Sequence, residues 1–84
     1  MYKIVYRKSA AKALLKLPIK IVQQFTQAFE LMAGGCDDSL DIKKLEGREG
    51  FRLRIGSYRA IYRKLNDVMI IEVVKVGSRG DFYK

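Results

Sequence analysis

The feature that most constrains the fold of this chain is a change to a two-residue hydrophobic period after residue 50. Arginines alternate with apolar residues over 51–55 and, after Gly56-Ser57, again over 58–63, with Ile61 standing where a further arginine would continue the pattern. A period of two is that of a β-strand. A glycine-containing pair between two such runs is typical of a tight hairpin turn. The segment therefore predicts two antiparallel strands joined at Gly56-Ser57.

A third strand is expected after a second turn pair, Asn66-Asp67. Residues 68–76 are mostly apolar, which is typical of a central strand that is covered on both faces. Gly77 then begins a short tail that reaches Lys84. Together these segments predict a three-stranded antiparallel meander.

The first half of the chain predicts a strand followed by two helices. Residues 2–6 alternate in polarity and indicate a short strand. Ser9 is placed to cap a helix over 10–15, and Pro18 suits the first turn of a second helix. That second helix is expected to end at Gly34-Gly35. Its larger apolar residues recur every three or four positions on one face: Val22, Phe25, Phe29 and Met32.

Residues 36–50 are polar and are expected to form a solvated connection. Their aspartates, Asp37, Asp38 and Asp41, lack the spacing and the closing glutamate of an EF-hand, so no metal is expected there. The predicted fold class is therefore α+β: an N-terminal strand, a two-helix hairpin and the meander, with the helices packed on one face of the sheet. At 84 residues the chain is expected to form one domain, 1–84.

The Gly56-Ser57 turn predicts a register for the first two strands of the meander. It pairs Ile55 with Tyr58, Arg54 with Arg59, Leu53 with Ala60 and Arg52 with Ile61. Directly paired residues point to the same side of a sheet, so one side is apolar and is the expected seat of the helices: Phe51, Leu53, Ile55, Tyr58, Ala60 and Tyr62. The other side, which we call the arginine face, holds Arg52, Arg54, Arg59 and Arg63.

A two-residue turn at Asn66-Asp67 would extend this register to the third strand. It pairs Tyr62 with Ile71 and Ala60 with Val73, and it places Glu72 opposite Ile61 and Val74 opposite Arg59. Glu72 is then the single carboxylate expected on the arginine face. There it would neutralise part of the cluster and position a guanidinium.

Four arginines on two neighbouring strands indicate an anion-binding site. Like charges directly opposite each other weaken a sheet by about 0.2–1 kcal/mol. A small domain tolerates this loss of stability more readily where an anion binds to the charges. A guanidinium also binds phosphate through two parallel hydrogen bonds, which an ammonium group does not. The alternative is that this is the ordinary solvent face of a one-sided sheet.

The composition favours a polyanionic partner. Seventeen Lys and Arg residues against nine Asp and Glu give a net charge of +8, which suits nucleic acid, although the same charge also keeps an ordinary basic protein dispersed. The chain has no histidine, so the usual general base and the commonest metal ligand are missing. One cysteine, Cys36, and the lack of a signal peptide or a long apolar run predict a cytoplasmic protein without disulfides, metals or cofactors.

Two runs of residues carry a resemblance to a known family. The first is Lys44-Leu45-Glu46-Gly47 followed by FRLRIGSYRAIY at 51–62, and the second is VGSRGDFY at 76–83. Leu17-Pro18 at the break between the predicted helices matches as well. Together they resemble the RelE/ParE superfamily of toxins from type II toxin–antitoxin systems, and the resemblance covers nearly the whole chain.

The resemblance implies a RelE-like endoribonuclease that cuts messenger RNA in the decoding site of the ribosome without a metal, and that is silenced by an acidic, partly disordered antitoxin. In RelE-type members, two basic residues of the first hairpin strand, an arginine after the turn, a tail arginine and a terminal tyrosine act on RNA. The corresponding catalytic candidates are Arg52, Arg54, Arg59, Arg79 and Tyr83, with flanking RNA-binding candidates at Lys43, Lys44, Arg48 and Arg63. Gyrase-poisoning ParE relatives generally lack this full set.

In the implied mechanism, the ribose 2′-hydroxyl attacks the adjacent phosphate and leaves a 2′,3′-cyclic phosphate and a 5′-hydroxyl. Arg52 and Arg59 would clamp the phosphate, Arg79 would stabilise the phosphorane, and Tyr83 would stack on the nucleotide. RelE has lysines at the two first-strand positions, and the second is its proposed base. Arg54 keeps its proton and is a poor base, so its expected role is to stabilise the 2′-oxyanion.

Two alternatives stay open. One is a ParE-like inhibitor of DNA gyrase, which performs no chemistry of its own. The other is a catalytically inactive module of the same fold, whose arginine face binds RNA or an acidic protein with a strong salt dependence.

Overall fold

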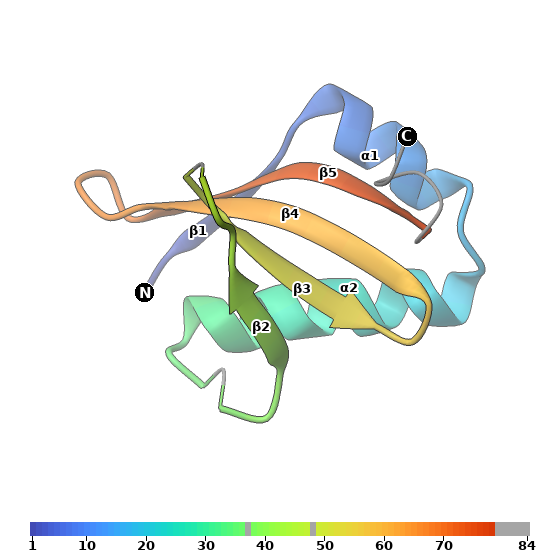
Figure 1. Ribbon diagram of the computed structural model, residues 1–84, viewed down its shortest axis with the longest axis horizontal. Helices are drawn as coiled ribbons and strands as arrows, with labels where there is room; N and C mark the ends of the chain where they lie inside the picture. Colours follow the sequence, from blue (N-terminus) through green and yellow to red (C-terminus); the bar gives the residue numbers. More distant parts are fainter. Residues whose placement is uncertain (37, 48, 79–84) are drawn as a thin grey trace.

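A computed structural model describes residues 1–36, 38–47 and 49–78 of the chain. Its elements follow in the order β1 (Lys3–Tyr6), α1 (Lys8–Leu15), α2 (Ile19–Ala33), β2 (Asp41–Lys44), β3 (Phe51–Ile55), β4 (Tyr58–Leu65) and β5 (Ile70–Ser78) (Figure 1). The predicted α+β class, with a strand, a helix pair and then an antiparallel meander, is confirmed.

The sheet contains two more strand pairings than the meander alone. Its order is β1-β5-β4-β3-β2, with β1 parallel to β5 and every other pair antiparallel. The prediction of a loop over 36–50 was wrong in one part, because Asp41–Lys44 forms the edge strand β2 against β3. Four residues with three charged side chains give little periodic signal, and charged residues are common where an edge strand must avoid further pairing.

The first helix does not start at the predicted cap. Ser9 lies inside α1 and does not cap it, because the helix begins at Lys8 with Arg7 as its cap residue. The backbone N–H of Arg7 donates to Val73 O at 2.9 Å, so pairing with the sheet sets where this helix begins. Pro18 directly precedes α2, and Gly34 ends that helix as expected. In the described part of the chain, no helix has both the length and the apolar character needed to cross a membrane.

The predicted register of the first hairpin is confirmed. β3 and β4 pair Arg54 with Arg59 and Leu53 with Ala60, and Gly56 supplies the positive φ of 60° that the tight turn needs.

The predicted register between β4 and β5 was wrong. Residues 66–69 connect these strands, instead of Asn66-Asp67 alone, so Tyr62 pairs with Val73. A bulge at Val74 then shifts the pairing by one more position, since Ile61 is opposite Lys75. As a result, Glu72 is opposite Arg63, and Arg59 is opposite Gly77.

The core lies between the helices and the apolar side of the sheet. Figure 1 shows α2 running along the sheet beneath β3 and β4. The Phe29 ring makes T-shaped contacts with Tyr6 and Tyr62, at ring-centroid distances of 6.1 Å and 5.6 Å. Burial, with Glu30 nearby, raises the pKa of the Tyr6 hydroxyl. The apolar side of the sheet packs against the helices, as predicted. The most deeply buried residues come from α2 and three strands: Phe25, Phe29, Met32, Leu53, Ala60, Tyr62, Ile71 and Val73.

Replacing Phe29 with Ala is expected to lower the free energy of unfolding by about 3–5 kcal/mol, because the ring is fully buried and its loss leaves a cavity. Val68→Ala is the control, since this side chain is 61% exposed in the 66–69 connection, and its change should stay within about 0.5 kcal/mol. Equilibrium unfolding in urea measures both. Similar losses in the two variants would contradict the central position of Phe29.

Candidate functional site

The arginine face lies on the side of the sheet away from the helices. Its arginines alternate along β3 and β4 with Leu53 and Ala60, which are fully buried in the core. Across the sheet the face forms two aligned rows of register partners. One row is Asp41, Arg54, Arg59 and Gly77, and the other is Lys43, Arg52, Ile61 and Lys75.

A hollow of about 450 Å³ opens at one end of this face. It is lined by Lys43, Lys44, Leu45, Glu46, Arg52 and Arg59. Its volume falls within the range of about 300–1,000 Å³ that small-molecule sites have. The structure therefore brings together two catalytic candidates and two RNA-binding candidates from three strands.

The wall of the hollow depends on the segment between β2 and β3. The Leu45 N–H donates to Gly50 O at 3.1 Å, which closes this segment on itself. Gly50 has a φ of 125°, and a Cβ there would meet Tyr62 O at 3.1 Å and Leu45 Cδ1 at 3.3 Å. Only glycine therefore allows the segment to lie this close to β4.

Asp41 is a functional candidate that sequence reasoning missed. Its Oδ2 lies 2.8 Å from Arg54 Nε, and its Oδ1 lies 3.4 Å from Arg52 Nη2, so one carboxylate bridges both arginines of β3. The expectation that Glu72 is the single carboxylate on this face was therefore wrong. The error has the same source as the missed strand, because the alternation at 41–43 was the only available signal for β2.

Glu72 positions a guanidinium as predicted, although the partner is Arg63. Its Oε1 lies 3.1 Å from Arg63 Nε, and its Oε2 lies 3.4 Å from Arg7 Nε. Arg7, at the start of α1, was not predicted to join this face. Arg63 faces Glu72 and does not line the hollow, so the structure does not bring this RNA-binding candidate to the hollow.

The other arginines differ in burial. Arg54 is half exposed, while Arg52 is only 21% exposed. The Nε atom of Arg52 is buried and makes no hydrogen bond among the described residues. A buried guanidinium nitrogen that lacks an acceptor favours an anion, and two arginines with two lysines around one hollow suit a phosphate group. Arg48, Arg79 and Tyr83 lie outside the described residues.

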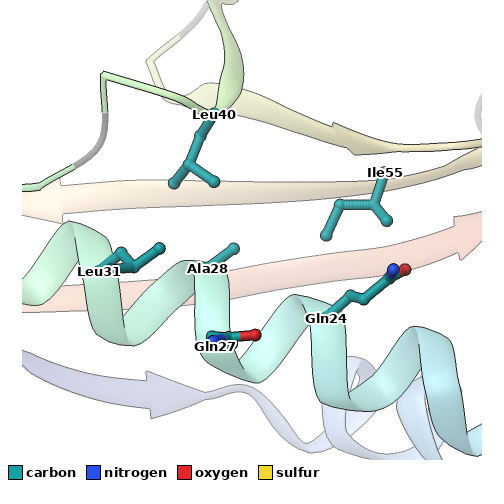
Figure 2. Close-up of a pocket in the computed structure, with 6 residues that line it drawn as sticks. All are labelled: Gln24, Gln27, Ala28, Leu31, Leu40 and Ile55. Atoms are coloured by element: carbon teal, nitrogen blue, oxygen red, sulfur yellow. The ribbon is translucent and has the colours of Figure 1, made fainter.

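A separate hollow lies on the helix side of the sheet. Figure 2 shows Leu40 and Ile55 pointing toward Ala28 and Leu31 of α2, with two glutamines at its margin, Gln24 and Gln27. None of the predicted site residues lines it. Within the described ranges, no group of three or more His, Cys, Asp or Glu side chains is placed to hold a metal.

The fold is that of the toxins of toxin–antitoxin pairs. The family model for the ParE toxin of the type II toxin–antitoxin system parDE matches residues 4–83, and the chain belongs to this family. It is a toxin of the RelE/ParE superfamily. A comparison with curated proteins found no match.

Solved toxin structures share this fold along nearly their whole length. The RelB–RelE complex of Methanococcus jannaschii matches with a TM-score of 0.80 at 26% identity, over 94% of this chain and 94% of that chain. The RelE–RelB complex of Pyrococcus horikoshii OT3 matches with a TM-score of 0.79 at 28% identity, over 94% of this chain and 96% of that chain. The RelBE complex of E. coli matches with a TM-score of 0.76 at 21% identity, over 93% of this chain and 96% of that chain. At this identity the match shows likeness of fold alone.

Replacing Gly50 with Ala is expected to reduce the free energy of unfolding by about 1–3 kcal/mol, because a side chain is strained at its positive φ and meets Tyr62 O. Glu49→Ala is the control, since Glu49 is exposed and adjacent. Thermal and urea unfolding of both variants provide the measurement. An unchanged Gly50→Ala protein would mean that close packing against β4 does not depend on glycine.

Proposed function

We propose that this toxin is an mRNA interferase, a metal-independent endoribonuclease that cleaves messenger RNA in the decoding site of the ribosome. The observation that carries the proposal is the hollow in which Arg52 and Arg59, from neighbouring strands, face Lys43 and Lys44. Cations spaced along a groove are suited to a polyphosphate backbone, and arginines are suited to one phosphate within it.

In the proposed reaction, the ribose 2′-hydroxyl attacks the adjacent phosphorus, and the bond to the 5′-oxygen breaks. Arg52 and Arg59 clamp the phosphate and stabilise the charge that develops on its oxygens. Arg79 stabilises the phosphorane, and Tyr83 stacks on and orients the nucleotide, as the resemblance of the tail implies. The products are a 2′,3′-cyclic phosphate and a 5′-hydroxyl.

Catalysis of this kind depends on positioning and charge more than on proton transfer by the arginines. The chain has no histidine, and the arginines of the site retain their protons. The ribosome is expected to hold the message with its 2′-hydroxyl in line for attack. Free RNA should therefore be a poor substrate, and fast cleavage of naked RNA would contradict this part of the proposal.

The partner that silences the toxin is proposed to be a cognate antitoxin with an acidic, partly disordered segment. Such a segment pays its ordering entropy on binding and can wrap a small basic domain. The archaeal relatives were solved as complexes of RelE with RelB, which supports a partner of this kind. We propose that both proteins act in the cytoplasm, where the ribosomes are.

A second candidate function is inhibition of DNA gyrase. The matching family model is named for the ParE toxin, and this favours the gyrase alternative. A gyrase inhibitor needs a docking surface and no chemistry, so its toxicity should survive replacement of Arg79 or Tyr83. The third possibility, an inactive basic binding module, predicts salt-dependent RNA binding without any toxicity.

The deciding experiment is induction of the toxin in a bacterial host, with primer extension to map 5′ ends on a translated message. Arg79→Ala and Tyr83→Phe are compared with the unaltered chain. We expect new ends within codons, only while the message is translated, and their loss in Arg79→Ala. Growth arrest with intact messages and DNA breaks would identify gyrase as the target, and no arrest would favour the inactive module.

Replacing Arg52 or Arg59 with Gln is expected to lower the cleavage rate by about 10²–10³-fold, as the loss of one preorganised donor to a developing oxyanion does. Each change should also reduce the salt dependence of binding to single-stranded RNA by about 0.7 in the slope of log K against log salt. Lys20→Gln is the control, because Lys20 is exposed at the start of α2. Equal effects of all three changes would mean that net charge, and not the hollow, governs the activity.

A further inference from the structure

The proposed reaction releases a proton from the 2′-hydroxyl, and the site needs a group that accepts it. Histidine is absent from the chain, and neither Arg52 nor Arg54 gives up its proton at ordinary pH. Lysines and carboxylates are the other acceptors in common use, and of these a carboxylate is ordinarily unprotonated near neutral pH. The described carboxylates in contact with the arginine face or its hollow are Asp41, Glu46 and Glu72.

Two of these carboxylates are poorly placed for the task. Glu72 contacts Arg63 and Arg7, and neither of these arginines lines the hollow. Glu46 does line the hollow, but it lies outside the strands, in the segment between β2 and β3. Groups on loops are held less precisely than groups on strands.

Asp41 is held in place by both backbone and side-chain contacts. It lies on β2 directly opposite Arg54, and its Oδ2 lies 2.8 Å from Arg54 Nε. Its other oxygen, Oδ1, makes the longer contact of 3.4 Å to Arg52 Nη2. Arg54 therefore acts as a tether, while Oδ1 is the oxygen that can be released.

Arg52 connects this carboxylate to the hollow. The same guanidinium contacts Asp41 and lines the hollow beside Arg59. A phosphate on Arg52 would therefore share this guanidinium with the Asp41 carboxylate. Its oxygens would compete with Oδ1, which makes the longer contact, while the shorter contact holds Oδ2 on Arg54.

We propose that Asp41 is the proton acceptor of the cleavage reaction, with Arg54 as the positioning residue that holds it; this inference rests on the ribonuclease function proposed above. The 2′-oxygen bonds to phosphorus as its proton passes to Asp41 Oδ1. The bond between phosphorus and the 5′-oxygen breaks, and the leaving oxygen takes a proton from water. Asp41 then returns its proton to solvent, so protons balance over one turnover.

The charged groups that face Asp41 come from three strands. Arg52 and Arg54 lie on β3, Arg59 follows in the same row on β4, and Lys43 is two residues along β2. All four carry basic side chains, and Asp41 is the carboxylate that lies among them.

The test is single-turnover cleavage by the full-length toxin on ribosomes programmed with a defined message. Asp41→Asn is expected to lower the maximal rate by about 10²–10⁴-fold, the usual contribution of a general base. The toxin concentration giving half-maximal rate should stay the same or fall, because the change removes a negative charge that competes with phosphate. Asp67→Asn, in the exposed connection between β4 and β5, should match the unaltered chain.

The pH profile distinguishes a proton acceptor from a structural contact. With a carboxylate as the proton acceptor, the unaltered toxin should show a nearly constant rate between about pH 6.5 and 8.5. In Asp41→Asn, hydroxide from solution must take the proton, and the rate should rise about tenfold for each pH unit. Asp41→Glu should restore a flat profile at a reduced rate, while Arg54→Gln should be slower with a flat profile.

Three outcomes would overturn the inference. A flat profile in Asp41→Asn would mean that the residue has only a structural role. A tenfold rise per pH unit in Glu46→Gln, with none in Asp41→Asn, would assign the proton to Glu46. If circular dichroism shows that Asp41→Asn is unfolded, a cleavage rate that rises tenfold per pH unit in Asp41→Glu would reject the role of this carboxylate. Absence of cleavage by the unaltered toxin would reject the proposed function itself, which is a separate result.

Discussion

The pairing of β3 with β4 is the interaction on which both the core and the candidate site depend. It places Leu53 and Ala60 against the helices and, with the opposite set of side chains, Arg52 and Arg59 on the outer face. A slip of one residue would turn the arginines into the core and expose its apolar half. The tight turn at Gly56 and the burial of the apolar set exclude that slip, so the energy that folds the domain also aligns the arginines.

Local patterns were sufficient to predict the parts of the fold that this hairpin dominates. Periodicity, a turn pair and a diglycine ending identified the hairpin, its register and the face of α2 that is buried. What could not be predicted depends on contacts between distant segments. The start of α1 is set by a bond from Arg7 to Val73, and the end of the β4–β5 connection places Met69 at a φ of 54°, which methionine rarely adopts.

The candidate site likewise has features that local patterns predict and features that depend on contacts between distant segments. The four arginines of the face follow from alternation within one hairpin, and their common orientation was predictable. Their neutralisation was not, because it comes from β2 and β5, whose placement depends on a short edge strand and on a bulge at Val74. Asp41 bridges Arg52 and Arg54, and Glu72 bridges Arg63 and Arg7, whereas Lys43 and Lys44 line the hollow beside Arg52 and Arg59.

Arginine in place of lysine on β3 changes how charge and protons are handled in such a site. A lysine can, in principle, stabilise an anion in one state and accept a proton in the other, whereas a guanidinium keeps its charge throughout. Two arginines therefore require that proton transfer be assigned to another group, and a fixed pair of guanidiniums is well suited to hold a carboxylate next to a phosphate. The contacts of Asp41 with Arg52 and Arg54 meet that requirement on an adjacent strand. Under the proposed mechanism, the proton passes to a residue of β2 while the two arginines of β3 keep their charge.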